Sequence, residues 1–187
     1  MGTRCPHDCQ LEAGDTILQY PQFFTQTQGL YNMTTNNLNI RKAKLNDADG
    51  IHQLVNSMAK KDLMLPRALS EIYENIRDFY ICEIDGKLIG CSALHITWID
   101  LAEIRSVVVD CDYQGKGIGN KLVNQCLDEA KEIGLKKIFA LTYVSGFFRK
   151  LGFTDISKEE LPHKIWNDCI KCPKFPNCNE EALIKNI

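Results

Sequence analysis

Residues 114–119 read Q-G-K-G-I-G and join an apolar run, V-V-V at 107–109, to a long amphipathic pattern over 117–133. Glycine is entropically costly, but it accepts positive φ angles and lets another group come close to the backbone. The first N–H groups of a helix have no partner within the helix, and the helix dipole favours negative charge there. A strand that leads through a glycine-rich turn into a helix therefore suits an anion, and Lys116 can add a positive charge.

The glycine spacing separates this turn from two common phosphate-binding loops. A nucleoside-triphosphate loop needs Gly-Lys-Ser/Thr after four intervening residues, whereas Lys116 is followed by Gly117. The dinucleotide fingerprint needs its third glycine three positions after the second, whereas Gly119 comes two positions after Gly117. A turn that holds the phosphates of another cofactor and a turn that only packs both stay open at this point.

Patterns on either side of the turn predict strands and helices. Asp85-Gly86 lies between two apolar runs and predicts a hairpin with a type I′ turn, since both positions need positive φ. Before it, Asn46 or Asp47 can cap one helix and Ser70 a second, shorter one. The order β-α-α-β-β-β-α-β-α-β predicts an α/β fold with a mixed sheet and helices on its faces. The predicted strands cover 38–43, 79–84, 87–94, 101–109, 137–142 and 153–156, and the later predicted helices cover 117–133 and 146–151.

Length and composition predict one domain with appendages. A chain of 187 residues with 44% hydrophobic and 25% charged residues suits a single globular domain. A net charge of −2 argues against a nucleic-acid binder, and no apolar run reaches the ~20 residues that span a membrane. The chain begins without an apolar signal-peptide core, so we expect a cytoplasmic protein. We expect an N-terminal extension over 1–37 with the natural start near Met33, a domain over 38–157, and a cysteine-rich tail over 158–187 packed on it.

Two stretches together resemble a known superfamily. They are V-V-V-D-C-D-Y-Q-G-K-G-I-G at 107–119 and F-F-R-K-L-G-F at 147–153. Over about residues 38–156 the chain resembles the GNAT superfamily of acyl-CoA N-acetyltransferases. The resemblance implies a mixed, mostly antiparallel twisted sheet of about six to seven strands, flanked by helices. It also implies that acetyl-CoA is the cosubstrate and that the glycine turn holds the CoA pyrophosphate.

The same resemblance implies which residues bind CoA. In the superfamily, the strand before the turn splays from its neighbour and offers backbone groups to the acetyl and pantetheine amides. An aromatic residue of the last short helix would pack against the CoA arm or the core. The implied CoA-binding positions are Val107, Val108, Val109, Gln114, Gly115, Lys116, Gly117, Ile118, Gly119, Asn120 and Phe148.

Three stretches are similar to the short, single-domain N-acetylglutamate synthases that begin bacterial arginine biosynthesis. They are L-A-E-I-R-S-V-V-V at 101–109, L-T-Y-V-S-G-F-F-R-K-L-G-F at 141–153 and L-P-H-K-I-W-N-D-C-I-K-C-P-K-F-P-N-C at 161–178. This resemblance implies L-glutamate as the acceptor, with a related amino acid as an open alternative. Glutamate carries two carboxylates, and the planar fork of arginine binds a carboxylate with two hydrogen bonds. We therefore expect Arg67 and Arg105 to bind the substrate, and the alternative for each is a structural or solvated ion pair.

Glu103 is the predicted general base. The α-ammonium of the acceptor must lose a proton before it attacks, and strand alternation places Glu103 on the same face as Arg105 and Val107. The alternative is that Glu103 only pairs with Arg105. In the superfamily a tyrosine protonates the departing thiolate, but Phe148 occupies that position here. Tyr143 could substitute as the acid, or the thiolate leaves without one because a thiol pKa near 8.5 is tolerable.

The chain has nine cysteines, and their spacing near the C-terminus is distinctive. A C-x2-C-x5-C run suits a tetrahedral zinc ion, which needs a fourth ligand. Reduced structural thiols are the alternative, while a disulfide is disfavoured in a reducing cytoplasm. The predicted zinc ligands are Cys169, Cys172, Cys178 and His163, with Cys5, His7 or Cys9 as substitutes for the histidine. Cysteines that stand singly are expected to be small buried hydrophobes, and these are Cys82, Cys91, Cys111 and Cys126.

Three classes of function stay open from the sequence. The first is an enzyme that acetylates the α-amine of a small amino acid, with L-glutamate expected. The second is an acetyltransferase for another small amine or for a protein N-terminus. The third is a non-catalytic CoA-binding sensor, which the loss of the tyrosine at Phe148 supports and the presence of Glu103 opposes. A homodimer and feedback by arginine are left undecided.

Overall fold

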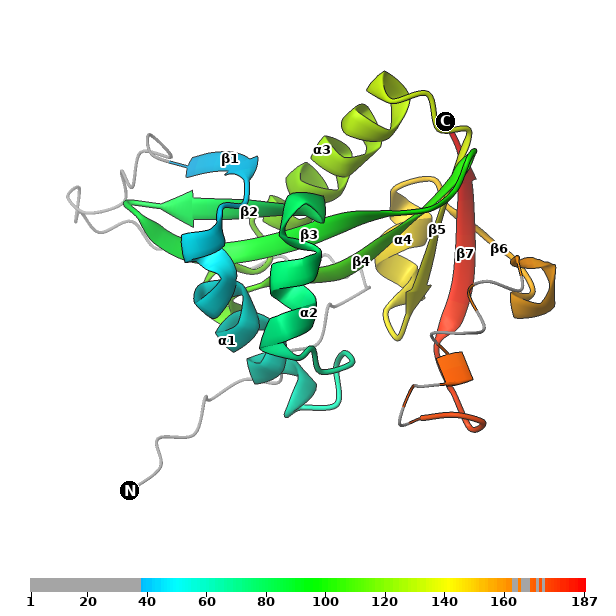
Figure 1. The fold of residues 1–187 in the computed structure, drawn as a ribbon, viewed down its shortest axis with the longest axis horizontal. Helices are drawn as coiled ribbons and strands as arrows, with labels where there is room; N and C mark the ends of the chain where they lie inside the picture. The colour runs from blue at the N-terminus through cyan, green and yellow to red at the C-terminus, as the bar shows by residue number, and fades with distance from the viewer. Residues whose placement is uncertain (1–37, 163–164, 166–168, 171, 173) are drawn as a thin grey trace, which may run out of the picture.

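The computed structural model of the protein describes residues 38–162, 165, 169–170, 172 and 174–187. Within them lies a seven-stranded sheet in the order β1-β2-β3-β4-β5-β7-β6 (Figure 1). Neighbouring strands are antiparallel except for β4 and β5, so the mixed, mostly antiparallel sheet is confirmed. The strands are β1 Leu38–Lys42, β2 Phe79–Ile84, β3 Lys87–Trp98, β4 Leu101–Val109, β5 Lys137–Thr142, β6 Thr154–Asp155 and β7 Glu181–Asn186. The helices are α1 Ala48–Ala59, α2 Leu69–Glu74, α3 Ile118–Glu132 and α4 Ser145–Lys150, with 3-10 turns that include η2 Ile76–Asp78 and η3 Cys111–Tyr113.

The last strand, β7, extends the predicted order by one element. It lies between β5 and β6, and it pairs along its full length with β5. Its buried residues are the adjacent Ala182 and Leu183, so its sequence shows no clean alternation of apolar and polar residues. The segment that we expected to be a packed tail therefore also supplies an interior strand of the sheet.

The turns and helix starts follow the sequence in part. Asp85 and Gly86 take φ angles of 50° and 77°, as the predicted type I′ hairpin requires. Ser70 lies inside α2 and does not cap it. The Glu71 carboxylate instead accepts a hydrogen bond of 3.2 Å from the N–H of Ala68 at the start of this helix. None of the described helices combines the length and the apolar character that a membrane crossing needs.

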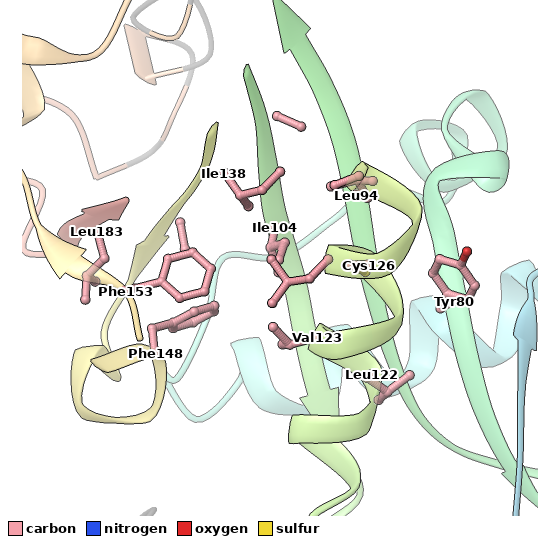
Figure 2. Packing of buried hydrophobic residues seen from close by; sticks show 14 of the residues in the cluster. Tyr80, Leu94, Ile104, Leu122, Val123, Cys126, Ile138, Phe148, Phe153 and Leu183 are labelled. Atoms are coloured by element: carbon pink, nitrogen blue, oxygen red, sulfur yellow. The ribbon is translucent and has the colours of Figure 1, made fainter. Parts of the chain in front are cut away.

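Helices cover both faces of the sheet. On one face α1 and α2 pack through Ile51 and Ile72 in a buried cluster. On the other face α3 and α4 contribute Leu122 and Phe148 to a second buried cluster, which Figure 2 shows against Ile104 of β4. The face of each strand residue can therefore be read from the cluster it joins.

The described residues from Leu161 to Glu180, called the C-terminal segment below, pack on the same face as α1 and α2. Leu161 and Ile165 pack with Leu101 and Phe139 in a third cluster. Leu101 neighbours Ala102, which packs with α3, and adjacent strand residues point to opposite faces. The α1/α2 face therefore has two covers, the helices over one part and the C-terminal segment over another.

A β-bulge in β4 reverses the alternation of its side chains. Ser106 and Val107 lie opposite a single residue of β3, and Ser106 has a φ angle of 55°. Ile104 packs in the α3 cluster before the bulge, and Val107 packs there after it. Val107 thus lies on the opposite face from Glu103 and Arg105. The expectation of one shared face was wrong, because period-2 alternation assumes a ladder without an inserted residue.

The sheet splits between β4 and β5. These strands pair from Leu101 opposite Lys137 to Glu103 opposite Phe139. Among the described residues no further pair continues this ladder, so the edge of β4 from 104 to 109 has no neighbouring strand beyond that point. The split exposes backbone groups in the middle of the molecule.

Candidate active site

A groove of about 1970 Å³ passes through the split and is lined from both faces of the sheet. The glycine turn and α4 line it on the α3/α4 face. The loop at 63–67, α2 and the C-terminal segment line it on the α1/α2 face. Among the described residues predicted for the site, all line this groove except Lys116. The groove thus brings together positions from most of the chain.

The glycine turn forms an open cradle at the start of α3. Gly115 and Gly117 have φ angles of 72° and 75°, in the region that other residues rarely adopt. A Cβ atom at either position would meet no heavy atom within 4 Å, so space lies beside the backbone. Gly119 is different, since its Cβ would lie 3.4 Å from the Phe147 ring. The first two glycines serve backbone conformation, and the third allows close packing against α4.

Two polar residues of the turn have partners within the protein. The Gln114 amide donates a hydrogen bond of 2.9 Å to the carbonyl of Val109 and so ties the turn to the end of β4. The Lys116 ammonium donates to the carbonyl of Asp112 at 3.2 Å and lies over the Tyr113 ring. In this arrangement Gln114 shapes the cradle, and Lys116 contributes positive charge from outside the groove.

Phe148 lines the groove and belongs to the core. It is 3% exposed, and its ring makes edge-to-face contacts with Phe147 and Phe153 at centroid distances of 5.1 and 5.3 Å (Figure 2). Such aromatic pairs add stability beyond the area they bury. The residue that replaces the superfamily's tyrosine therefore acts as a wall of the groove and as a core residue.

The floor of the groove on the α1/α2 face carries opposite charges. Arg105 Nη1 lies 3.9 Å from Glu103 Oε2, and these side chains are 13% and 16% exposed. Because both residues precede the bulge, their side chains point to the α1/α2 face of the sheet, beside the split. The structure therefore contains the ion pair that was the alternative to the base role, and both members line the groove.

Asn56, which no sequence pattern singles out, holds the backbone of Arg67. The Asn56 side chain on α1 donates to the Arg67 carbonyl at 2.9 Å and accepts from the Arg67 N–H at 3.2 Å. This pair of hydrogen bonds fixes the backbone of the loop where Arg67 lines the groove. Asn56 lies eleven residues earlier, and only the tertiary structure reveals the contact.

Glu180 is a second carboxylate of the groove that the sequence reading missed. Burial raises its pKa, and the negative charge of Glu103 adds to that increase. The Cys178 thiol lies 3.6 Å from its Oε2 atom and acts in the opposite direction. The signal in the sequence was its position two residues after Cys178, at the end of the cysteine run.

Tyr143, the predicted substitute acid, lies at the end of β5. Its hydroxyl is buried and finds no hydrogen-bond partner among the described residues. Burial, together with the nearby Glu180 and the cysteine thiols, raises the pKa of Tyr143 to about 12. Such a phenol keeps its proton at neutral pH and is poorly matched to a thiolate whose conjugate acid has a pKa near ~8.5.

The cysteines of the C-terminal segment line the groove as free thiols. Burial, followed by the neighbouring thiols, raises the pKa of Cys169, which disfavours the thiolate that zinc requires. No group of three or more metal-ligating side chains occurs within the described part of the chain. His163, Cys5, His7 and Cys9 lie outside that part. Zinc therefore has no support here, and the remaining expectation is reduced thiols beside the acceptor end of the groove.

The chain matches a family model and several curated proteins. The model described as the acetyltransferase (GNAT) family matches residues 50–153. An uncharacterized N-acetyltransferase from Chlorobaculum tepidum is 40% identical over 148 residues, which are 79% of this chain and 96% of that protein. An amino-acid acetyltransferase from Mycobacterium tuberculosis is 36% identical over 132 residues, which are 69% of this chain and 75% of that protein. Longer amino-acid acetyltransferases, such as that of Vibrio vulnificus at 33% identity, match over only 28% of their length.

Solved structures show the same fold. A Mycobacterium tuberculosis protein crystallised in complex with CoA superposes with a TM-score of 0.69 at 30% identity, over 79% of this chain and 98% of that one. The N-acetylglutamate synthase of Neisseria gonorrhoeae, complexed with coenzyme A and N-acetyl-glutamate, gives a TM-score of 0.73 at 29% identity. That match covers 80% of this chain and 35% of the synthase. The present chain thus corresponds to about a third of the longer protein.

Proposed function

The chain belongs to the acetyltransferase (GNAT) family, and on that premise we propose that it transfers the acetyl group of acetyl-CoA to the α-amine of an amino acid, with L-glutamate as the acceptor. The observation that carries this proposal is the composition of the groove. One end is an open, backbone-lined cradle, and the other end carries charges of both signs around the split, among them Arg67, Arg105, Glu103 and Glu180.

The donor end suits CoA. The free N–H groups at the start of α3 and the positive helix end favour the pyrophosphate. The unpaired edge of β4 offers backbone groups to the amides of the pantetheine arm, since no strand of the described residues occupies it. Phe148 and its aromatic neighbours give an apolar wall for the thioester end. Solved relatives that contain CoA support this assignment.

The acceptor end suits a molecule with both signs of charge. Arg67 and Arg105 can each bind a carboxylate, and a dicarboxylic amino acid has two. Glu103 and Glu180 can hold the α-ammonium between the carboxylates. A monoamine without carboxylates would make use of neither arginine. The relatives called amino-acid acetyltransferases support the same acceptor class, and a role in arginine biosynthesis would follow from glutamate as substrate.

The chemistry is direct transfer. Glu103 takes a proton from the α-ammonium, and the amine lone pair attacks the thioester carbonyl carbon. A C–N bond forms, the C–S bond breaks, and the electron pair leaves on sulfur as the CoA thiolate, while the new amide nitrogen loses its second proton to solvent. The thiolate leaves without an acid catalyst because its conjugate thiol, with a pKa of about 8.5, is acidic enough, and the thiolate then takes a proton from solvent. Tyr143 is the reserve donor for this last step, which its pKa of about 12 disfavours.

The test is thiol release from acetyl-CoA against the twenty amino acids and several simple amines, with the protein kept reduced. Selective turnover of L-glutamate supports the proposal. Turnover of another amino acid would keep the acceptor class and change the specificity. Turnover of a peptide N-terminus alone, or CoA binding without turnover of any amine, would overturn it in favour of a protein acetyltransferase or a CoA sensor.

A further inference from the structure

One polar pair at the edge of the groove, of which only the histidine lines it, has no role in the mechanism above. His95 lies near the end of β3, and its Nδ1 atom is 2.7 Å from Oδ2 of Asp78, the last residue of η2. Their side chains are 31% and 25% exposed. His95 lines the groove on the α1/α2 face. A short histidine–carboxylate contact at this position requires an explanation beyond packing.

The contact with Asp78 determines which nitrogen of the His95 imidazole carries the proton. An ionised carboxylate can only accept a hydrogen bond, so Nδ1 must carry the proton. In the neutral ring the lone pair then stands on Nε2, on the side away from Asp78. A carboxylate at Nδ1 also stabilises the imidazolium that forms when Nε2 takes a proton. The pair is thus arranged as an oriented proton acceptor.

The register of the sheet places this acceptor beside the predicted base. His95 is directly opposite Glu103 in the β3–β4 ladder. Side chains of directly opposed residues share a face, with Cβ atoms about 4.5–5.5 Å apart. Both side chains line the groove on the α1/α2 face. Asp78 contacts His95 from η2, and the charged residues that line the groove from α2, β4, the loop at 63–67 and the chain from 158 to 180 are Glu71, Glu74, Glu103, Arg105, Arg67, Lys158, Glu159 and Glu180.

We propose that His95, oriented by Asp78, receives the proton that Glu103 takes from the acceptor and passes it to solvent. An N–H bond of the ammonium breaks as an O–H bond forms on Glu103. That O–H bond breaks as an N–H bond forms at Nε2 of His95, and the imidazolium then releases the proton to water. The inference rests on the proposed function and adds a positioned proton carrier to it.

The relay is useful because a carboxylate is a weaker proton acceptor than an imidazole near neutral pH. A glutamate carboxyl in a model peptide has a pKa of about 4.3 and an imidazole about 6.5, so the imidazole is the better proton acceptor near neutral pH. A relay to His95 restores Glu103 to its charged form after each turnover. Partial exposure of His95 gives the proton a route to solvent.

The experiment compares kcat as a function of pH for the wild type, His95→Gln and Asp78→Asn. In the wild type we expect kcat to fall on acidification through the range where imidazoles titrate. His95→Gln should lower kcat by about 10²-fold at neutral pH, the lower end of general acid–base effects, and remove that acidic limb. Asp78→Asn keeps the shape of the side chain but removes the negative charge that favours the imidazolium. The acidic limb of the kcat profile should therefore move to lower pH.

Two controls separate the relay from a structural role. His52→Gln changes a histidine of α1 that does not line the groove, and its profile should match the wild type. His95→Gly should regain activity when imidazole is added to the buffer, while its KM for acetyl-CoA stays within about twofold. An unshifted acidic limb in His95→Gln, or no rescue by imidazole in folded His95→Gly, would overturn the relay. An inactive wild type across the amino-acid panel would instead overturn the proposed function.

Discussion

Gly117 combines a positive φ angle with open space around its missing side chain. Gly117→Trp should abolish acetyl-CoA binding, because the indole would fill the cradle. Gly86→Trp is a matched control, since Gly86 has φ of 77° and equally open surroundings in the β2–β3 turn. Both substitutions carry a strain of about 1–2 kcal/mol. Calorimetric titration with acetyl-CoA should separate them, and equal affinity in the two variants would contradict the cradle.

Arg67 is expected to read one carboxylate of the acceptor. Arg67→Ala should raise the KM for glutamate about 10–100-fold, the range of a charge-assisted hydrogen bond, with little change in the KM for acetyl-CoA. Arg77→Ala removes an arginine that does not line the groove and should leave both constants unchanged. Steady-state kinetics with each substrate varied will show whether the carboxylate site lies elsewhere.

Glu180 has a raised pKa, with burial as the main cause. A carboxyl whose pKa is higher when folded stabilises the fold below its unfolded pKa, and this contribution is lost as pH rises through the folded value. Glu180→Gln stays neutral, so its Tm relative to wild type should increase from pH 4 to pH 8. Each kcal/mol corresponds to about 2–4 °C for a chain of this size. A Tm difference independent of pH would show that Glu180 is not penalised by burial.

At the scale of elements, the bulge at Ser106 decides which residues meet at the split. Strand propensity ranks valine above serine and glycine, whereas a φ angle of 55° ranks glycine first and valine last. We therefore expect Ser106→Val to lose about 1–3 kcal/mol in urea unfolding and Ser106→Gly to stay close to wild type. If urea unfolding instead ranks the valine variant as the most stable, as strand propensity predicts, the backbone at the bulge is not strained.

The same bulge shows which parts of the fold can be predicted from the sequence and which cannot. The strand limits Leu101–Val109, the type I′ hairpin and α3 follow from apolar periodicity and glycine placement, which are local signals. The face of Val107 depends on one inserted residue, and no local pattern marks it. β7 was missed because Ala182 and Leu183 are adjacent rather than alternating.

The residues of the candidate site also fall into those that the sequence predicts and those that it does not. The glycine turn and Glu103 could be chosen from motif and strand position. Asn56, His95 and Glu180 could not, since each acquires its role through a partner distant in the chain. Lys116 was chosen for its charge, but its ammonium donates to the Asp112 carbonyl on η3 and the residue does not line the groove. Such contacts depend on tertiary packing.

At the scale of the whole molecule, the groove is lined from both faces of the sheet, and in the proposed function the two substrates approach from opposite faces and meet at the split. Both can be bound together, so initial rates should follow a sequential pattern. The cysteines that line the acceptor end make an acetyl-enzyme the obvious alternative. Mass spectrometry after incubation with acetyl-CoA alone should find the unmodified chain. Parallel double-reciprocal plots together with an acetylated cysteine would contradict direct transfer.

The separation of the two approaches has a consequence for how such a protein can diversify. In the proposed function, cofactor recognition resides in β4 and the turn into α3, while acceptor recognition resides in the loop at 63–67 and the C-terminal residues that line the groove. These parts touch opposite faces of one sheet, so substitutions in them should act almost independently. Selection can therefore exchange the acceptor while the machinery for the activated acyl group is inherited unchanged.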